Sequence, residues 1–399
     1  MIFERRIPFF LISRHLRRAN RWTLGLVIFL MSVAFVNLVF VNSLFNGVIR
    51  TSNQQVIDLN GNITVTPERG QEFISDTPAV VKTIEETPGV QAASARVLVP
   101  GVYTFGNVQN SYQTVAVDPE QEADATVVSQ RMIAGSYLSP TATDQIILGK
   151  LVAGGKGVLM NATSLQGARV GDSVTLTLGD VSRSFKVVGI FYVKSVEEDR
   201  QAFISNRSLD LQAPAYSSKA TSIVVKTEKK GDERQVIRRL KAKGVPGTFT
   251  TWKEQAGQAS SVNSTFVTIN ALLTTVGFII AAVVIFIIIY VDVSTRRRQI
   301  GILRAIGIKP NIVISTYVLQ STVYSVLGVL LGSVLYFVII VTYFKVHPFK
   351  LPLGDVRLSV DYIDYLVRGA AVIIVSILSG LIPSILATRG NILDEIHGR

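Results

Sequence analysis

A short basic and amphipathic segment, Ser294–Pro310 (STRRRQIGILRAIGIKP), holds the residues of this chain best suited to a specific interaction. In a helix, one face of the segment would carry the apolar residues Ile300, Leu303, Ile306 and Gly307. Arg297 and Arg304, seven residues apart, would share another face. An apolar face can enter a groove on a partner or lie among lipid headgroups, while arginines bond carboxylates or phosphates. The residues alone therefore predict either a docking helix or a turn that anchors two membrane spans.

The rest of the sequence lacks the spacing of a catalytic or cofactor site. The nearest approach to a phosphate-binding loop, Lys150–Gly157 (KLVAGGKG), has lysine where the first glycine belongs and glycine where the hydroxyl belongs. The three histidines, His15, His347 and His397, fall in separate segments without metal-ligand spacing. We therefore expect a chain that is not an enzyme and has no metal site or cofactor of its own.

Long uncharged runs flank the basic segment, so it is expected to lie at a membrane surface. Phe266–Val291 precedes it and Asn311–Phe344 follows it, and about 20 apolar residues suffice to cross a bilayer as a helix. Trp22–Phe45 is a third uncharged run, and Ile363–Ala387 is a fourth span with charges only in its first turns. A composition that is 48% hydrophobic, with positive mean hydropathy, also favours an integral membrane protein.

The distribution of arginines predicts how the chain is oriented. The first 21 residues hold six arginines and one acid, and the basic segment adds Arg296–Arg298, so both termini are expected in the cytoplasm. We attribute the net charge of +12 to this excess of arginines on the cytoplasmic side and to contact with membrane lipids, rather than to binding of nucleic acid. The first apolar run is longer than the roughly 7–15 residues of a signal peptide, which predicts an uncleaved anchor.

These spans divide the chain into nine segments. The predicted segments are 1–21 (cytoplasmic basic N-terminus), 22–45 (first span), 46–265 (extracytoplasmic domain with stalk helices), 266–291 (second span), 292–310 (cytoplasmic coupling helix), 311–344 (third span), 345–362 (short extracytoplasmic loop), 363–387 (fourth span) and 388–399 (cytoplasmic tail). The helical stalks are expected at 46–58 and 252–264, which are polar and free of proline; ordinary linkers are the alternative.

The long segment between the first two spans predicts a mixed fold. Alternating apolar residues predict strands at 62–66, 97–99, 114–117, 145–148, 173–178, 184–191, 202–205 and 222–226. Helices are expected at 76–86 and 233–243. The predicted fold class is therefore membrane α-helical, with four transmembrane helices and a large α+β extracytoplasmic domain between helices one and two.

Several residues inside the spans are suited to helix packing. The amides Asn37, Asn42, Asn270 and Gln320 either line a path for a cargo or hydrogen-bond across helix interfaces. Gly328 and Gly332 have the Gly-x-x-x-Gly spacing, which permits close packing of helices, including packing at a dimer interface.

From Ser294 onward the sequence resembles the permease subunits of the MacB/LolC/LolE/FtsX superfamily of ABC transporters. The family's Arg-rich, E-I-G-I-L-R-A-[IL]-G pattern is matched by Arg297, Arg298, Gln299, Ile300, Gly301, Ile302, Leu303, Arg304, Ala305, Ile306 and Gly307. Gln299 departs from it, because the family usually has glutamate there. The outer region matches more loosely at Thr87–Val90, Ile147–Leu151, Val170–Val174 and Phe185–Ile190. Ser43–Gly47 and Leu319–Ser321 favour the LolC/LolE branch.

This resemblance implies a permease that works by mechanotransmission, in which a separate ABC ATPase drives the outer domain from the cytoplasm. The permease would lie in the bacterial plasma membrane, and two copies of that ATPase would bind ATP and Mg. The residues on which the ATPase would dock are Arg297, Arg298, Gln299, Ile300, Gly301, Leu303, Arg304, Ile306 and Gly307. The permease itself would pair with a second copy or a paralogue, and the outer domain with an adaptor or a lipoprotein.

The resemblance leaves two functions open. One is extraction or export of a lipophilic cargo such as a lipoprotein, a lipid or an amphiphilic peptide or drug. The other is FtsX-like signalling, in which the outer domain activates a cell-wall hydrolase without transport. The size of the outer region, about 215 residues, favours the first.

Overall fold

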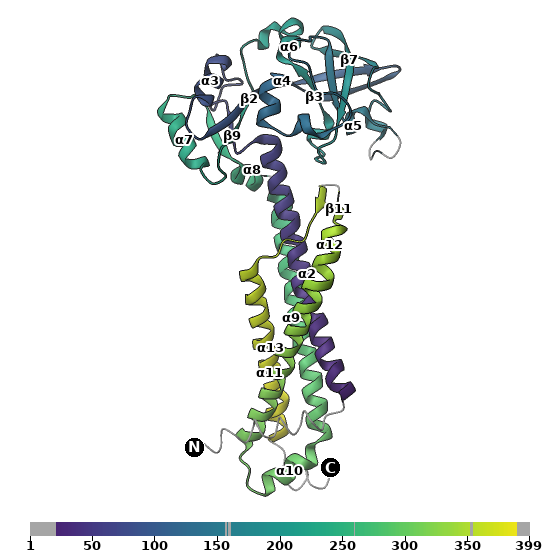
Figure 1. Cartoon of the computed structure of the whole chain (residues 1–399), viewed down its shortest axis with the longest axis vertical. Coiled ribbons are helices and arrows are strands. Elements are labelled where there is room, and N and C mark those ends of the chain that lie inside the picture. Colours follow the sequence, from purple (N-terminus) through teal and green to yellow (C-terminus); the bar gives the residue numbers. More distant parts are fainter. Residues whose placement is uncertain (1–20, 156–157, 159–160, 259, 352–353, 389–399) are drawn as a thin grey trace. The chain divides into compact units, whose positions relative to one another are not determined.

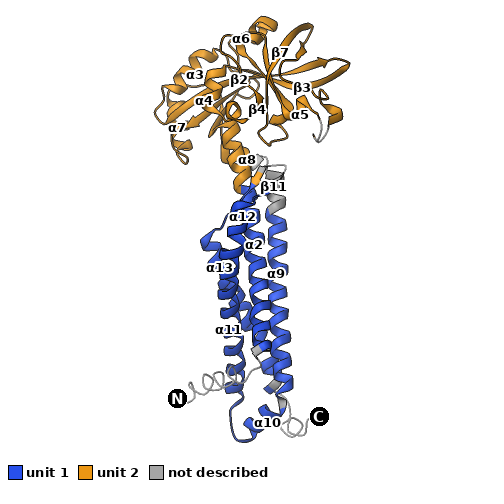
Figure 2. Cartoon of the chain, turned by 45° about the vertical axis from the view of Figure 1, so that its right-hand side comes forward, with its two compact units in different colours: residues 1–49, 262–349, 356–399 blue, residues 50–261, 350–355 orange. Residues whose placement is uncertain are grey.

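The computed structural model describes residues 21–388 apart from 156–157, 159–160, 259 and 352–353. The predicted basic N-terminus, up to residue 20, and the predicted tail from residue 389 lie outside the described residues. The chain divides into two compact units (Figure 2). The membrane unit comprises residues 1–49, 262–349 and 356–399, and the α/β unit comprises residues 50–261 and 350–355.

Within the described residues, the membrane unit has four long apolar helices, which lie side by side (Figure 1). They are α2 (Arg21–Asn60), α9 (Ser260–Thr295), α11 (Pro310–Val334) and α13 (Tyr362–Thr388). Beyond Val334, α11 continues through a π-helical segment, η5 (Leu335–Val341), into α12 (Thr342–Val346). All four are long and apolar enough to cross a membrane, as the uncharged runs predict. A short helix, α10 (Arg297–Ala305), joins α9 to α11, and a hairpin of β11 (Phe349–Leu351) and β12 (Gly354–Val356) joins α12 to α13.

Glycines allow the helices of this unit to approach closely. A Cβ at Gly332 would lie 2.9 Å from the ring of Phe35 and 3.0 Å from the Ser32 carbonyl oxygen on α2. Gly328, one turn earlier, faces Met31 in the same way. This pair therefore packs α11 against α2 within one chain, where small residues permit close approach.

The α/β unit contains one mixed sheet of ten strands. Its strands are β1 (Ile63–Thr66), β2 (Val90–Phe105), β3 (Val108–Val117), β4 (Met132–Gly135), β5 (Gln145–Gly149), β6 (Ser173–Leu178), β7 (Val181–Phe191), β8 (Gln201–Ser205), β9 (Ser222–Thr227) and β10 (Thr248–Thr251). Its helices are α3 (Thr77–Glu85), α4 (Pro119–Ala125), α5 (Lys150–Ala153), α6 (Asn206–Gln212), α7 (Glu233–Ala242) and α8 (Trp252–Gln258), with short 3₁₀ turns η1 (Val128–Arg131), η2 (Asn161–Thr163), η3 (Glu198–Arg200) and η4 (Pro214–Tyr216).

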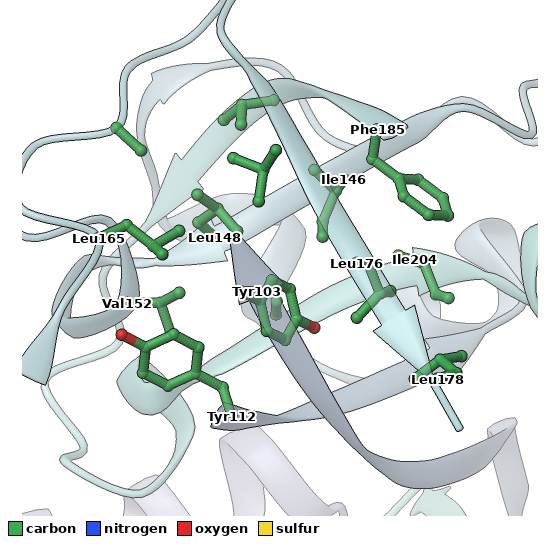
Figure 3. Close-up of a cluster of buried hydrophobic side chains, with 14 of the residues drawn as sticks. Tyr103, Tyr112, Ile146, Leu148, Val152, Leu165, Leu176, Leu178, Phe185 and Ile204 are labelled. Carbon is green, nitrogen blue, oxygen red and sulfur yellow. The ribbon is translucent and has the colours of Figure 1, made fainter. Parts of the chain in front are cut away.

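Six of these strands close into a ring. The order runs β2-β3-β8-β5-β7, and β6 pairs with both β7 and β2. Closure removes the exposed edges that would otherwise pair with other chains. The interior is filled by side chains such as Tyr103, Leu148, Leu176 and Phe185, all of which are buried (Figure 3).

The long strand β2 also belongs to a second lobe. Its first part, Val90–Arg96, pairs with β9, which continues the sheet through β1 to β10. Helices α3 and α7 supply the rest of this lobe's buried cluster, including Ile84 and Leu240. A single strand therefore joins two cores, which explains why one region of about 200 residues folds as one unit.

Candidate functional site

Helix α10 presents two different sides. Ile300 is only 3% exposed and shares a buried cluster with Val293, Val313 and Tyr317 from α9 and α11. Ile302 and Ile306, by contrast, are 47% and 72% exposed. The buried side fixes α10 to the bundle, and the other side is free to meet a partner.

The structure therefore buries one part of the predicted apolar face of α10 and exposes the other part. Ile300 and Gly301 are buried, and Leu303 and Arg304 are half-buried. The exposed predicted residues are Arg298, Gln299, Ile306 and Gly307. Only the backbone of Arg297 is described. Ile302 stands in the motif but was not predicted as a contact residue, because the helical-face argument placed it beside the apolar stripe rather than on it.

The end of α10 follows from its sequence. Gly307 has φ of +93°, a left-handed conformation that glycine adopts without strain. Its N–H donates to the Arg304 carbonyl at 3.0 Å, and the Ile308 N–H donates to the Leu303 carbonyl at 3.1 Å. This pair of bonds is the Schellman motif, and Pro310 then occupies the first turn of α11. The turn between α10 and α11 is thus set by two residues, and α10 has a defined length.

At the other end of α10, the carboxylate of Asp292 links α9, the start of α10 and α11 through hydrogen bonds. Asp292, near the end of α9, accepts from Arg296 Nε at 2.9 Å through Oδ1. Its Oδ2 accepts from Gln320 Nε2 of α11, also at 2.9 Å. Gln320 is 2% exposed and lies 2.9 Å from the Tyr324 hydroxyl. Because Arg296 is the residue that precedes α10, Asp292 holds the junction of α9 and α10 against α11.

Asp292 was not among the predicted site residues. It begins the predicted segment 292–310, directly after the uncharged run. The spacing of Asp292 and Arg296, four residues apart, is the signal that could have identified the pair, since such residues meet on one helix face. Gln320, predicted either to line a path or to cross a helix interface, takes the second role.

A second polar network joins α2, α9 and α13. Asn42 Oδ1 accepts from Asn270 Nδ2 and from Arg368 Nη2, both at 2.8 Å. Arg368 also donates to Asp364 at 2.7 Å and to Thr274 at 2.9 Å, and Asn42 donates to Asp364. The Arg368 side chain is only 12% exposed. Charged side chains inside a bundle are costly unless they are paired, so this network fixes the three helices relative to one another.

Two described protein families match most of the chain. Residues 24–243 match the family described as MacB-like periplasmic core domain, and residues 271–392 match the FtsX-like permease C-terminal family. The ABC transporter permease YtrF of Bacillus subtilis (strain 168) is 27% identical over 244 residues, which cover 55% of this chain and 54% of YtrF. The match therefore spans about half the length of that relative.

Two solved structures are also similar. The periplasmic region of MacB from Actinobacillus actinomycetemcomitans has 12% identity and a TM-score of 0.38, covering 51% of this chain and 95% of that structure. The extracellular domain of the noncanonic ABC-type transporter YknZ from Gram-positive bacteria has 10% identity and a TM-score of 0.35, covering 48% of this chain and 97% of that structure.

Proposed function

This chain belongs to the MacB- and FtsX-like family of ABC transporter permeases, and from that premise we propose that it couples ATP hydrolysis in a separate ATPase to motion of its α/β unit. In this proposal the ATPase docks on the exposed side of α10, and the permease acts as a dimer with two ATPase copies. Both termini and α10 lie in the cytoplasm, as the arginine distribution favours.

The observation that carries the proposal is the two-sided character of α10. Its buried side is locked into the bundle by Ile300, and its two ends are fixed by Asp292 and by the Gly307 turn. A force that the ATPase applies to Ile302 and Ile306 would therefore be transmitted to α9 and α11, because α10 is fixed to both helices. Gln299, exposed beside them, offers an amide where related chains have a carboxylate, so we propose a neutral hydrogen bond to the ATPase at this position.

We further propose that the transported cargo is lipophilic, for example a lipoprotein, a lipid or an amphiphilic peptide. The proposal rests on the size of the α/β unit, which offers two lobes for handling a cargo or an adaptor. The resemblance to the LolC/LolE branch stays a prediction. Purification of the full chain with its bound molecules tests this point: a cell-wall hydrolase recovered in place of a lipophilic molecule would contradict transport and favour signalling.

The docking surface is tested by aspartate substitutions on α10. In the double variant Ile302→Asp with Ile306→Asp, two carboxylates replace the exposed apolar contacts, and we expect the ATPase to be lost from the purified complex. The matched control is Val181→Asp with Leu211→Asp, two residues that are 48% and 63% exposed in the α/β unit. Normal ATPase recovery with the α10 variant would overturn the assignment. Single arginine variants should matter less, since an exposed ion pair contributes about 0–1 kcal/mol.

A further inference from the structure

One face of α2 carries a polar side chain among exposed apolar ones. Leu26, Phe29, Leu30 and Val33 are between 40% and 58% exposed, and Asn37 is exposed as well. Their spacing of three and four residues places all five on one side of the helix. We call these five residues the Asn37 face. On the opposite side, α2 packs on α11 through Gly328 and Gly332.

Asn37 lies well inside the span. The uncharged run ends at Phe45, eight residues later, which corresponds to about 12 Å of helix. A carboxamide has two N–H donors and an oxygen acceptor, and hydrocarbon satisfies none of them. An amide at this depth is therefore stable only beside another polar group.

Three other amides of the spans have polar partners on neighbouring helices. Asn42, Asn270 and Gln320 hydrogen-bond to neighbouring helices. Exposed hydroxyls are satisfied within their own helix, since Thr275 and Ser315 donate to the carbonyls four residues earlier at 2.9 and 2.7 Å. In the described part of the chain the Asn37 side chain has no hydrogen-bond partner. Among the described span residues, Asn270 Oδ1 and the Tyr336 hydroxyl also have no hydrogen-bond partner, but both atoms are buried inside the bundle. The Asn37 carboxamide instead lies exposed on the outside of the bundle, where a second chain can reach it.

We propose that the Asn37 face binds the same face of a second copy of this chain, with the two Asn37 carboxamides bonded to each other. A two-fold axis brings equivalent residues of two copies together, and a carboxamide, being both donor and acceptor, pairs with itself. The flanking residues Val33 and Leu30 supply the apolar contacts around this bond. The inference rests on the proposed function, because it names the contact within the permease dimer.

The chain has no cysteine, so single cysteines report contacts without background. The full chain is expressed with its ATPase, and its membranes are treated with an oxidant that forms disulfides between Cα atoms within about 7 Å. We expect Val33→Cys and Leu30→Cys to give a disulfide-linked dimer of this chain. The matched controls are Ile374→Cys and Leu378→Cys on α13, which are 56% and 58% exposed and should crosslink several-fold less.

The role of the amide is tested in the Val33→Cys background. Asn37→Leu keeps an apolar surface but removes the hydrogen bond, and we expect crosslinking to fall several-fold, whereas Asn37→Gln should retain most of it. Equal crosslinking at α13, a product with a different protein, or no effect of Asn37→Leu would each overturn the proposal. If no disulfide-linked dimer forms while the ATPase is still recovered with the chain, this inference alone is wrong. The α10 variants test the docking surface separately.

Discussion

Arg96 and Glu122 form a buried ion pair in the α/β unit, with 2.6 Å between Arg96 Nη2 and Glu122 Oε1. The same Nη2 donates to the Leu59 carbonyl oxygen at 2.7 Å, and Nη1 donates to Asn60 Oδ1 at 3.2 Å. Leu59 and Asn60 are the last two residues of α2. The final carbonyls of a helix have no partner within it and attract positive charge. Arg96 therefore fastens the end of α2 to strand β2, and Glu122 balances its charge.

Replacing Glu122 should destabilise this attachment strongly. Glu122→Gln leaves the buried guanidinium of Arg96 without a counter-charge, and removing one partner of a buried pair costs about 3–5 kcal/mol. We expect the free energy of unfolding of the full chain to fall by about that amount in urea titrations followed by Trp252 fluorescence, with Trp22 replaced by phenylalanine.

The control for this prediction is Glu120→Gln, which changes an exposed residue of the same helix, α4. An exposed substitution of this kind should shift the free energy of unfolding by less than about 0.5 kcal/mol. If both variants unfold alike, the pair does not hold the end of α2.

The stability of the α/β unit should also depend on pH through Asp199. This side chain is 1% exposed, and its Oδ1 accepts from the Val193 N–H at 2.8 Å. Burial raises the pKa of Asp199 to about 7; the Val193 N–H opposes that rise, and the nearby Glu198 adds to it. The folded state thus favours the protonated acid, and ionisation weakens it as the pH rises from the ordinary pKa of about 4 through 7.

Asp199→Asn should remove this pH dependence. The variant keeps an oxygen acceptor for Val193 but carries no charge, so we expect it to match the natural chain near pH 4 and to unfold at a higher temperature above pH 7. The gain is a few kcal/mol at most, since one pKa unit corresponds to about 1.4 kcal/mol. Asp180→Asn, exposed in the turn between β6 and β7, serves as the control and should show no such trend. If the unfolding temperatures of the Asp199→Asn variant and the natural chain differ by the same amount at every pH from 4 to 8, Asp199 is not buried as a protonated acid.

Much of the fold could be predicted from local pattern. The strand at 173–178 has the predicted bounds, because its apolar residues alternate without interruption. Strand β2 was predicted only at 97–99, since Pro100 and Gly101 argue against a longer strand. The structure extends it to Val90–Phe105, because Pro100 lies between the part paired with β9 and the part paired with β6. At that point the strand has a neighbour on one side only, where a missing N–H is tolerated.

Which residues of the candidate site are buried and which are exposed could not be predicted from the sequence. Helical spacing placed Ile300 and Ile306 on one face, but the structure buries the first and exposes the second. Which part of an amphipathic helix is covered depends on how it lies against its neighbours, and the segment itself carries no such information. The same limit applies to Arg96 and Glu122, which are 26 residues apart and meet only through tertiary packing.

The last prediction concerns the junction that Asp292 holds. Asp292→Ala removes the acceptor for both Arg296 and Gln320, so the start of α10 loses its bonds to α11. Because local opening is governed by such contacts, we expect the backbone amides of Arg297–Ala305 to exchange hydrogen for deuterium several-fold faster in the full chain. ATPase recovery should fall only partly, since Ile302 and Ile306 remain exposed for docking. Asp210→Ala, exposed on α6, is the control and should leave exchange in α10 unchanged. Unaltered exchange in the Asp292 variant would mean that Ile300 alone fixes α10 to the bundle.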